Sequence, residues 1–198
     1  MNIPKISKRL EAAASFSRRG VRIADVGTDH AYLPIYLYTA GAVSGGVASD
    51  INQGPVDRAL RNVKGWGADG AISVLRTDGL NGIESYRPED IFILGMGGEL
   101  IASIIDAAPW VRAEGIRLIL QPMTHADTLR AYLFANGFEI IDETLVSDDK
   151  IYQIICAEYS GEVRVCTDPC ELSFGRRNIE RGGELLVRSL ERAREVYL

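Results

Sequence analysis

Five short segments carry the acids, glycines and amides that can do chemistry in this sequence, and each follows an apolar run. They read DVGTDH at 25–30, SDINQGP at 49–55, TDGL at 77–80, GMGGE at 95–99 and QPMTH at 121–125. If the apolar runs are strands of one parallel sheet, the segments meet at its carboxyl edge, where such sheets bind their ligands. Their small and polar side chains suit an elongated polar ligand.

The first segment begins like a nucleotide-binding turn, because an apolar run reaches Asp25 and a glycine follows at Gly27. Thr28, Asp29 and His30 then stand where a dinucleotide-binding loop has further glycines. The carboxylate of Asp29 would repel the pyrophosphate of NAD or FAD. S-adenosylmethionine has a sulfonium and an ammonium group and no phosphate, so a loop with two acids suits it. We therefore predict that these five residues bind S-adenosylmethionine.

Asp50 ends the second apolar run, about 20 residues after Gly27, where an acid grips ribose hydroxyls in related folds. A carboxylate accepts from both hydroxyls, and we expect Ile51 and Asn52 beside the same nucleoside. The alternative is that Asp50 or Asn52 caps the helix that begins near Pro55.

Asp78 follows the third run in the same way. Its side chain is predicted to bind the exocyclic amine of adenine, with Gly79 and Leu80 against the ring. The alternative is that Asp78 is a turn residue before Gly79.

The elements that must position these segments alternate along the chain. Expected strands are 22–26, 44–49, 72–75, 91–94 and 117–121, and expected helices are 31–39, 55–66, 98–107 and 124–136. The runs at 91–94 and 117–121 are nearly continuous, as in strands covered on both faces. This alternation predicts an α/β, doubly wound domain with a parallel sheet.

Residues 138–160 break the alternation, because two extended runs flank a polar turn at 147–150 with no helix between them. We predict an antiparallel hairpin at the edge of the sheet. Such an ending departs from the dinucleotide-binding repeat and is typical of Rossmann-type methyltransferases, whose last strand inserts antiparallel.

Both ends of the chain are expected to be helical. Residues 4–17 show an apolar helical face, and the chain from Asp168 onward reads as helix interrupted by Gly182 and Gly183. The predicted parts are an N-terminal basic helix packed on the core (1–20), a Rossmann-type methyltransferase domain that binds S-adenosylmethionine (21–160) and a C-terminal helical segment (161–198).

The N-terminal helix is basic although the chain has a net charge of −5. We predict that Lys5, Lys8, Arg9 and Arg18 contact nucleic acid, since a local basic patch is the usual footprint of such contacts. The alternative is a solvated helix face without a partner.

Six segments in collinear order resemble one family: ADVGTDHAYLP, SDINQGP, TDGL, ILGMGGELI, RLILQPMTHADTLRAYLFANGFEI and DDKIYQII. Over about residues 5–160 the chain is similar to the bacterial tRNA (adenine-22 N1)-methyltransferases. The resemblance implies a Rossmann-type domain, S-adenosylmethionine as donor, S-adenosylhomocysteine as product, and tRNA as substrate. Members usually carry a C-terminal coiled-coil domain that helps to hold tRNA, so residues 161–198 correspond to a reduced or truncated form of that arm.

Adenine N1 has an in-plane lone pair, so the expected catalysis is mainly positioning of the base in line with the methyl–sulfur bond. The base becomes cationic, and Asp29 is the candidate catalytic residue that stabilises this charge or accepts a proton from N6. The alternative is that Asp29 only orients the sulfonium or His30. For His30 itself, contact with the cofactor or a helix cap are the alternatives.

The glycines at 95–98 stand where amino-group methyltransferases have an Asn/Asp-Pro-Pro-aromatic motif. We predict that Gly95 and Met96 contact the cofactor, whereas Gly97 and Gly98 let the backbone approach the base. A tight strand-to-helix turn explains the same glycines. Two further residues are expected on the acceptor side, Gln121 and Pro122.

Composition narrows the remaining classes of protein. The chain of 198 residues contains three cysteines, Cys156, Cys166 and Cys170, which we expect to be reduced thiols with packing or incidental roles and no metal. No export signal or membrane-length apolar run is present, so the expected location is the cytoplasm. A methyltransferase for another substrate and a non-catalytic S-adenosylmethionine- or RNA-binding module stay open as alternatives. The oligomeric state is open, with a monomer as the simplest expectation.

Overall fold

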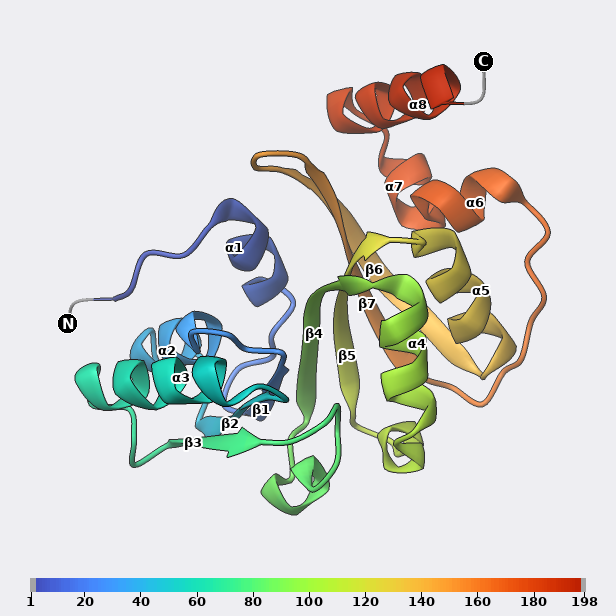
Figure 1. The fold of residues 1–198 in the computed structure, drawn as a ribbon. Helices are drawn as coiled ribbons and strands as arrows, with labels where there is room; N and C mark the ends of the chain where they lie inside the picture. Colours follow the sequence, from blue (N-terminus) through green and yellow to red (C-terminus); the bar gives the residue numbers. More distant parts are fainter. Residues whose placement is uncertain (1–2, 197–198) are drawn as a thin grey trace.

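A computed structural model describes residues 3–196 and contains one seven-stranded sheet in the order β3-β2-β1-β4-β5-β7-β6 (Figure 1). The strands are β1 (Arg22–Val26), β2 (Gly45–Asp50), β3 (Ile72–Arg76), β4 (Asp90–Gly97), β5 (Arg117–Thr124), β6 (Phe138–Ser147) and β7 (Ile151–Tyr159). The first five are parallel, and β7 lies antiparallel between β5 and β6. The predicted doubly wound fold with an inserted antiparallel strand is confirmed.

Helices cover both faces of the sheet. They are α1 (Lys8–Ala14), α2 (Tyr32–Thr39), α3 (Gln53–Gly65), α4 (Gly98–Asp106), α5 (Ala126–Ala135), α6 (Pro169–Phe174), α7 (Arg176–Arg181) and α8 (Glu184–Val196), with short 3₁₀ turns at Ile83–Tyr86 and Pro109–Arg112. Side chains alternate along each strand. Ala24 therefore packs with α4 and α5, whereas its neighbour Ile23 packs with α1 and α2.

Three strands extend further toward the carboxyl edge than their apolar runs predict. β2 includes Asp50, β4 continues through the glycines to Gly97, and β5 continues to Thr124. The register of β4 shifts on either side of Met96, which identifies a bulge rather than a simple turn. Pro122 is tolerated in β5 because the pairing with β7 ends at Leu120, so no ladder bond to β7 is lost.

The N-terminal helix is shorter than its apolar face predicts. It begins after Ser7, whose hydroxyl accepts a hydrogen bond from the amide of Leu10, and it ends before Ser15. Its buried residues, Ala13 and Ala14, pack against the face that α2 also covers. At the other end, glycines separate the helices, with Gly175 between α6 and α7 and the pair Gly182–Gly183 before α8.

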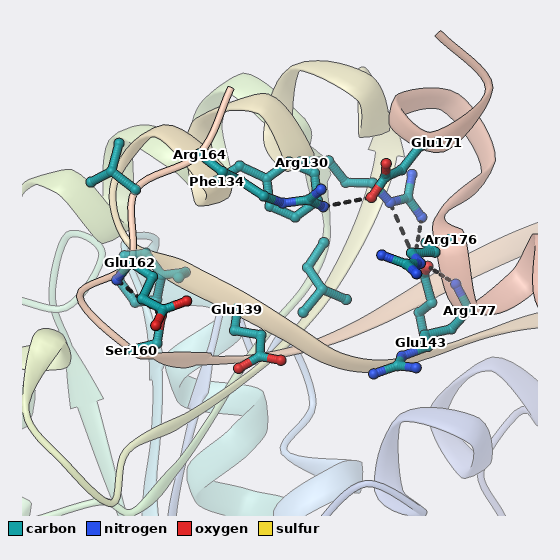
Figure 2. Close-up of a pocket in the computed structure, with 13 residues that line it drawn as sticks. Arg130, Phe134, Glu139, Glu143, Ser160, Glu162, Arg164, Glu171, Arg176 and Arg177 are labelled. Carbon is teal, nitrogen blue, oxygen red and sulfur yellow. Dashed lines mark hydrogen bonds and ion pairs between the residues drawn. The ribbon is translucent and has the colours of Figure 1, made fainter. Parts of the chain in front are cut away.

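A buried ion pair joins the C-terminal helices to the sheet (Figure 2). Arg130 of α5 and Glu143 of β6 are 0% and 1% exposed, and their charged atoms lie 2.7 Å apart. Glu143 also accepts from the amide of Arg177, while Arg130 donates to the carbonyl of Leu172. A Cβ at Gly175 would lie 2.0 Å from the Glu143 carboxylate, so only glycine lets this junction approach. In the described part of the chain, no helix is long and apolar enough to cross a membrane.

Candidate S-adenosylmethionine site

Part of the predicted site meets in a crevice at the carboxyl edge, where the strand order reverses between β1 and β4. The predicted cofactor-binding residues that do not line this cavity are Asp50, Ile51, Asn52, Asp78, Gly79, Leu80 and Met96. The cavity there has a volume of about 320 Å³. Its lining consists of Arg9, Leu10, Asp25, Gly27, Thr28, Asp29, His30, Tyr32, Leu33, Leu94 and Gly95. Six of the predicted cofactor-binding residues are therefore together, and one predicted RNA-binding residue, Arg9, lies with them.

The first loop is held against the end of β2. The amides of Gly27 and Thr28 donate to the carbonyl of Ser49 at 2.8 and 2.9 Å. Gly27 has a φ of +75°, and a Cβ there would lie 2.2 Å from the terminal methyl of Met96. A glycine is needed at this position for the backbone conformation, whereas the Met96 methyl is the end of a flexible side chain that can move.

Asp25 is the buried carboxylate of the crevice, at 6% exposure. Burial raises its pKa from 3.8 to about 6; a hydrogen bond from the Thr28 hydroxyl lowers it, and the negative charge of Asp50 raises it further. No lysine or arginine lies within 4 Å of this carboxylate in residues 3–196. Its ionised form therefore lacks a counter-ion that a cationic ligand would supply.

Asp29 is half exposed and is held from two sides. Oδ1 lies 2.5 Å from the guanidinium of Arg58 on α3, and Oδ2 lies 3.2 Å from Nε2 of His30. The His30 ring stacks on Tyr32, with centroids 5.2 Å apart and planes at 8°. Asp29 itself has a φ of +50°, which is uncommon for residues other than glycine, although Asp adopts it more readily than most. The loop is therefore held by an ion pair and an aromatic stack.

Asp50 does not cap the following helix. Its Oδ1 accepts from the backbone amide of Asn52 at 2.9 Å, and the side chain of Asn52, the residue before α3, makes no capping bond. Ile51 is 53% exposed beside it, as an apolar surface open to a ligand. These contacts leave one Asp50 oxygen without a protein partner among the described residues, in keeping with the predicted contact to ribose.

Residues 78–80 divide between surface and core. The Asp78 side chain is exposed, and its carbonyl accepts from the amide of Asn81 as in a turn. Gly79 lies against Ile104 of α4, and Leu80 is 4% exposed within the main core. Asp78 is free to meet a ligand, whereas the side chain of Leu80 already packs against protein.

The acceptor side of the crevice combines glycines with a buried amide. A Cβ at Gly98 would lie 2.1 Å from the carbonyl oxygen of His125, so this glycine is required by the close approach of the start of α4 to the segment between β5 and α5. Gly95 is exposed, with a φ of +77°, and Gly97 faces the Thr124 hydroxyl. Gln121 is fully buried at the end of β5, next to the buried Pro122. The strand-to-helix turn therefore explains Gly98, whereas Gly95 is open to a ligand.

The basic residues predicted to contact RNA do not share one surface. Lys5 and Lys8 are exposed. Arg18 instead lies at the amino edge of the sheet, where it pairs with the buried Asp90 at 2.7 Å and donates to the carbonyls of Glu89 and Gly115. The structure thus separates Arg18 from the crevice and gives its charge a structural partner.

Five residues of the site have no sequence prediction. Leu10, Tyr32, Leu33 and Leu94 line the cavity, and Arg58 braces Asp29 from the neighbouring helix. Tyr32 belongs to the segment ADVGTDHAYLP and lies two residues after His30, so its place next to the first loop could have been predicted from the sequence. Nothing in the sequence indicates that Arg58 faces the first loop, because its position depends on how α3 packs beside that loop in the folded protein.

A second, larger cavity of about 380 Å³ lies between α5, β6 and the segment after β7 (Figure 2). Its charged lining is largely satisfied internally, since Arg130 pairs with Glu143 and Arg164 pairs with Glu171. Arg164 also covers the ring of Phe134, with Cζ 3.7 Å from the centroid. None of the predicted site residues lines this cavity, so the crevice at the carboxyl edge is the candidate active site.

The residues of the crevice fit S-adenosylmethionine. The buried Asp25 carboxylate lacks a counter-ion, one acceptor oxygen of Asp50 is available, and Gly27 has a positive φ that favours glycine in the first loop. Asp29 is paired with Arg58, so the preference for a cationic ligand over a dinucleotide phosphate rests mainly on Asp25. The fold and these loops define a Rossmann-type methyltransferase domain.

Comparison with known proteins gives the same class. Residues 6–155 match the family model for a methyltransferase domain. The tRNA (adenine(22)-N(1))-methyltransferase of Bacillus subtilis is 40% identical over 176 residues, which make up 88% of this chain and 74% of the relative. The chain therefore belongs to the tRNA (adenine-22 N1)-methyltransferase family.

Solved structures agree with this assignment. A Streptococcus pneumoniae relative in complex with S-adenosyl-L-methionine superposes with a TM-score of 0.89 at 34% identity, over 96% of this chain and 89% of that chain. The M. capricolum protein TrmK in complex with S-adenosyl-homocysteine superposes with a TM-score of 0.82 at 28% identity, over 95% of this chain and 83% of that chain.

Proposed function

We propose that this protein methylates N1 of adenine 22 in tRNA with S-adenosylmethionine as donor. The observation that carries the proposal is the 40% identity to the Bacillus subtilis enzyme over 88% of the chain. It is supported by a crevice whose carboxylates suit a cationic donor and whose acceptor side has an exposed glycine backbone. A tRNA substrate places the activity in the cytoplasm.

The chain's own residues bind and orient the donor. Asp25 and Thr28 face its amino-acid end, Asp50 accepts from the ribose hydroxyls, Ile51 covers one face of the adenine, and Asp78 accepts from its amine. When bound, S-adenosylmethionine supplies a methyl group on a positively charged sulfur. Gly27 in the first loop, and the glycines of residues 95–97, have no side chain and let the backbone come close to the sulfur and its methyl group.

The acceptor base needs positioning more than activation, because N1 of adenine already presents a lone pair at neutral pH. Base pairing hides N1 in an RNA helix, so the base must be unpaired or turned out before it enters the crevice. Holding N1 in line with the donor then accounts for most of the required rate enhancement.

We assign the catalytic contribution to the carboxylate of Asp29. The base gains positive charge as its N1 is methylated, and a fixed negative charge nearby stabilises that state. Arg58 and His30 each use one acceptor position of Asp29, and an ionised carboxylate has about four such positions. The two neighbours therefore aim the carboxylate and leave it able to face the base.

Reverse transcription of tRNA tests the proposal, because a methyl group on N1 blocks base pairing. An unmodified tRNA transcript is incubated with the protein and S-adenosylmethionine, and the stop of a primer extension is mapped. We expect a new stop at adenine 22 and none in a transcript with guanine at that position. A stop elsewhere, or methylation of protein or small molecules alone, would reject tRNA adenine 22 as the substrate.

A further inference from the structure

Arg9 lies inside the crevice although it belongs to α1, the helix that covers one face of the sheet. Its Nη1 donates to Oε1 of Gln121 at 2.5 Å, and its Cζ lies 5.4 Å from the ring centroid of Tyr152. The same Nη1 would be 3.3 Å from a Cβ placed on Gly95. The guanidinium therefore lies directly against the glycine segment that borders the acceptor side.

The charge of Arg9 is not neutralised by the protein. No carboxylate lies within 4 Å of its guanidinium in the described chain, whereas Arg58, the other arginine beside the first loop, pairs with Asp29. A guanidinium has five donors, and Gln121 takes one of them. Arg9 thus presents a positive charge with unused donors to the crevice.

Gln121 is arranged to hold this guanidinium. It is fully buried, and its Nε2 donates to the carbonyl of Pro122 at 2.8 Å, which leaves Oε1 directed at Arg9. A buried amide is stable only when it is hydrogen-bonded, so the two side chains fix each other. Because the amide is neutral, it positions Arg9 without cancelling its charge.

The chemistry of the site decides what this cation binds. The donor is itself positively charged, and a cation beside N1 would oppose the charge that the base gains, so neither is the partner of Arg9. The anion available from the acceptor is an RNA phosphate, which a guanidinium binds through two parallel hydrogen bonds. We propose that Arg9, held by Gln121, binds a backbone phosphate next to the target adenine and thereby positions the base. This inference rests on the proposed function and adds the contact that places the nucleotide.

Salt dependence of tRNA binding tests the phosphate contact separately from catalysis. Arg9→Gln is compared with Arg19→Gln, which removes the same charge from an exposed position beyond the end of α1. Each contact with a single-stranded phosphate contributes a slope of about 0.7 to a plot of log K against log salt concentration. We expect Arg9→Gln to lose about that much slope and Arg19→Gln to keep the wild-type slope. Arg19→Gln should also bind S-adenosylmethionine with wild-type affinity.

Gln121→Glu keeps an acceptor for Arg9 and neutralises it with a carboxylate. Because it also removes the hydrogen bond from Nε2 to the carbonyl of Pro122, thermal unfolding is measured first to show that the variant is folded. The variant is expected to flatten the salt slope as Arg9→Gln does. A tRNA with a neutral methylphosphonate next to adenine 22 should bind to wild type more weakly than unmodified tRNA does. The Arg9→Gln variant should bind both tRNAs with the same affinity. Wild-type slopes in both variants, or equal sensitivity of Arg9→Gln to the neutral linkage, would overturn the inference. If the wild-type protein does not methylate adenine 22, the proposed function is rejected. The salt dependence and the methylphosphonate experiment still decide whether Arg9 contacts a phosphate.

Discussion

The guanidinium of Arg58 lies 2.5 Å from Oδ1 of Asp29 and joins α3 to the loop after the first strand. The partner on the other oxygen is His30, whose ring stacks on Tyr32. The loop that would face the reacting groups is therefore held by side chains from two helices. The two residues therefore have different proposed roles. The carboxylate of Asp29 faces the base, and Arg58 positions that carboxylate.

We expect Asp29→Asn to lower single-turnover methylation about 100-fold, the size of effect typical of one catalytic group, because the fixed negative charge is lost. Binding of S-adenosylmethionine, measured by calorimetry, should stay within a few-fold of wild type. Arg58→Gln removes only the brace, so its loss should be smaller, about 10-fold. Unchanged turnover in Asp29→Asn would show that this carboxylate has no catalytic role.

Asp25→Asn should stabilise the ligand-free protein and weaken donor binding. The pKa of Asp25 is raised from 3.8 to about 6, so its contribution to stability is present below pH 3.8 and is lost as the pH rises through 6. Two pKa units correspond to about 3 kcal/mol. The free energy of unfolding of the variant should therefore exceed that of wild type above pH 6 and converge with it near pH 4.

Urea unfolding across this pH range measures the effect, with the exposed Asp69→Asn as a control that should follow wild type throughout. Wild-type affinity for S-adenosylmethionine should also fall as the pH drops below 6, because protonated Asp25 no longer attracts a cation. A stability difference that does not depend on pH would mean that the burial of Asp25 is not its cause.

Gly98→Ala should destabilise the fold, because its Cβ would lie 2.1 Å from the carbonyl oxygen of His125. The contact is with backbone, which cannot rotate away, so the expected loss is about 1–3 kcal/mol. Gly65→Ala at the end of α3 meets open space and should be neutral or slightly stabilising. Denaturant unfolding measures both. A fully stable Gly98→Ala would indicate that the glycine serves the ligand and not the close approach of α4 to the start of α5.

Glu143→Gln should loosen the C-terminal helices. It leaves the buried charge of Arg130 without its partner, which costs about 3–5 kcal/mol. Hydrogen exchange should increase in α6 and α7, since Arg130 donates to the carbonyl of Leu172 in α6 and Glu143 accepts from the amide of Arg177 in α7. Arg176→Ala, which breaks only the exposed pair with Glu180, should leave unfolding unchanged. Equal exchange in Glu143→Gln and wild type would show that other contacts hold these helices.

Sequence reasoning identified the fold because apolar runs and their spacing are local properties. The doubly wound parallel sheet, the hairpin and the helix break at Gly182–Gly183 were all predictable, whereas the bulge at Met96 depends on the register between β4 and β5. The lengths of the strands at the carboxyl edge were underestimated because glycines and proline conceal strand continuation.

The placement of charged side chains was harder to predict. Arg9 and Arg18 lie close together in the sequence, yet one enters the crevice and the other pairs with Asp90 at the opposite edge. Arg58 reaches Asp29 only because α3 crosses the first loop. Such pairings depend on the geometry between elements, which a local pattern does not contain. The division at residues 20 and 160, and the binding roles of individual residues, stay predictions.

The most direct measurement is mass spectrometry of nucleosides from tRNA that lacks modification at adenine 22, after incubation with this protein and isotope-labelled S-adenosylmethionine. We predict labelled 1-methyladenosine, lost when adenine 22 is replaced by guanine and reduced about 100-fold in Asp29→Asn. Absence of labelled 1-methyladenosine, from protein that demonstrably binds S-adenosylmethionine, would contradict the proposed activity.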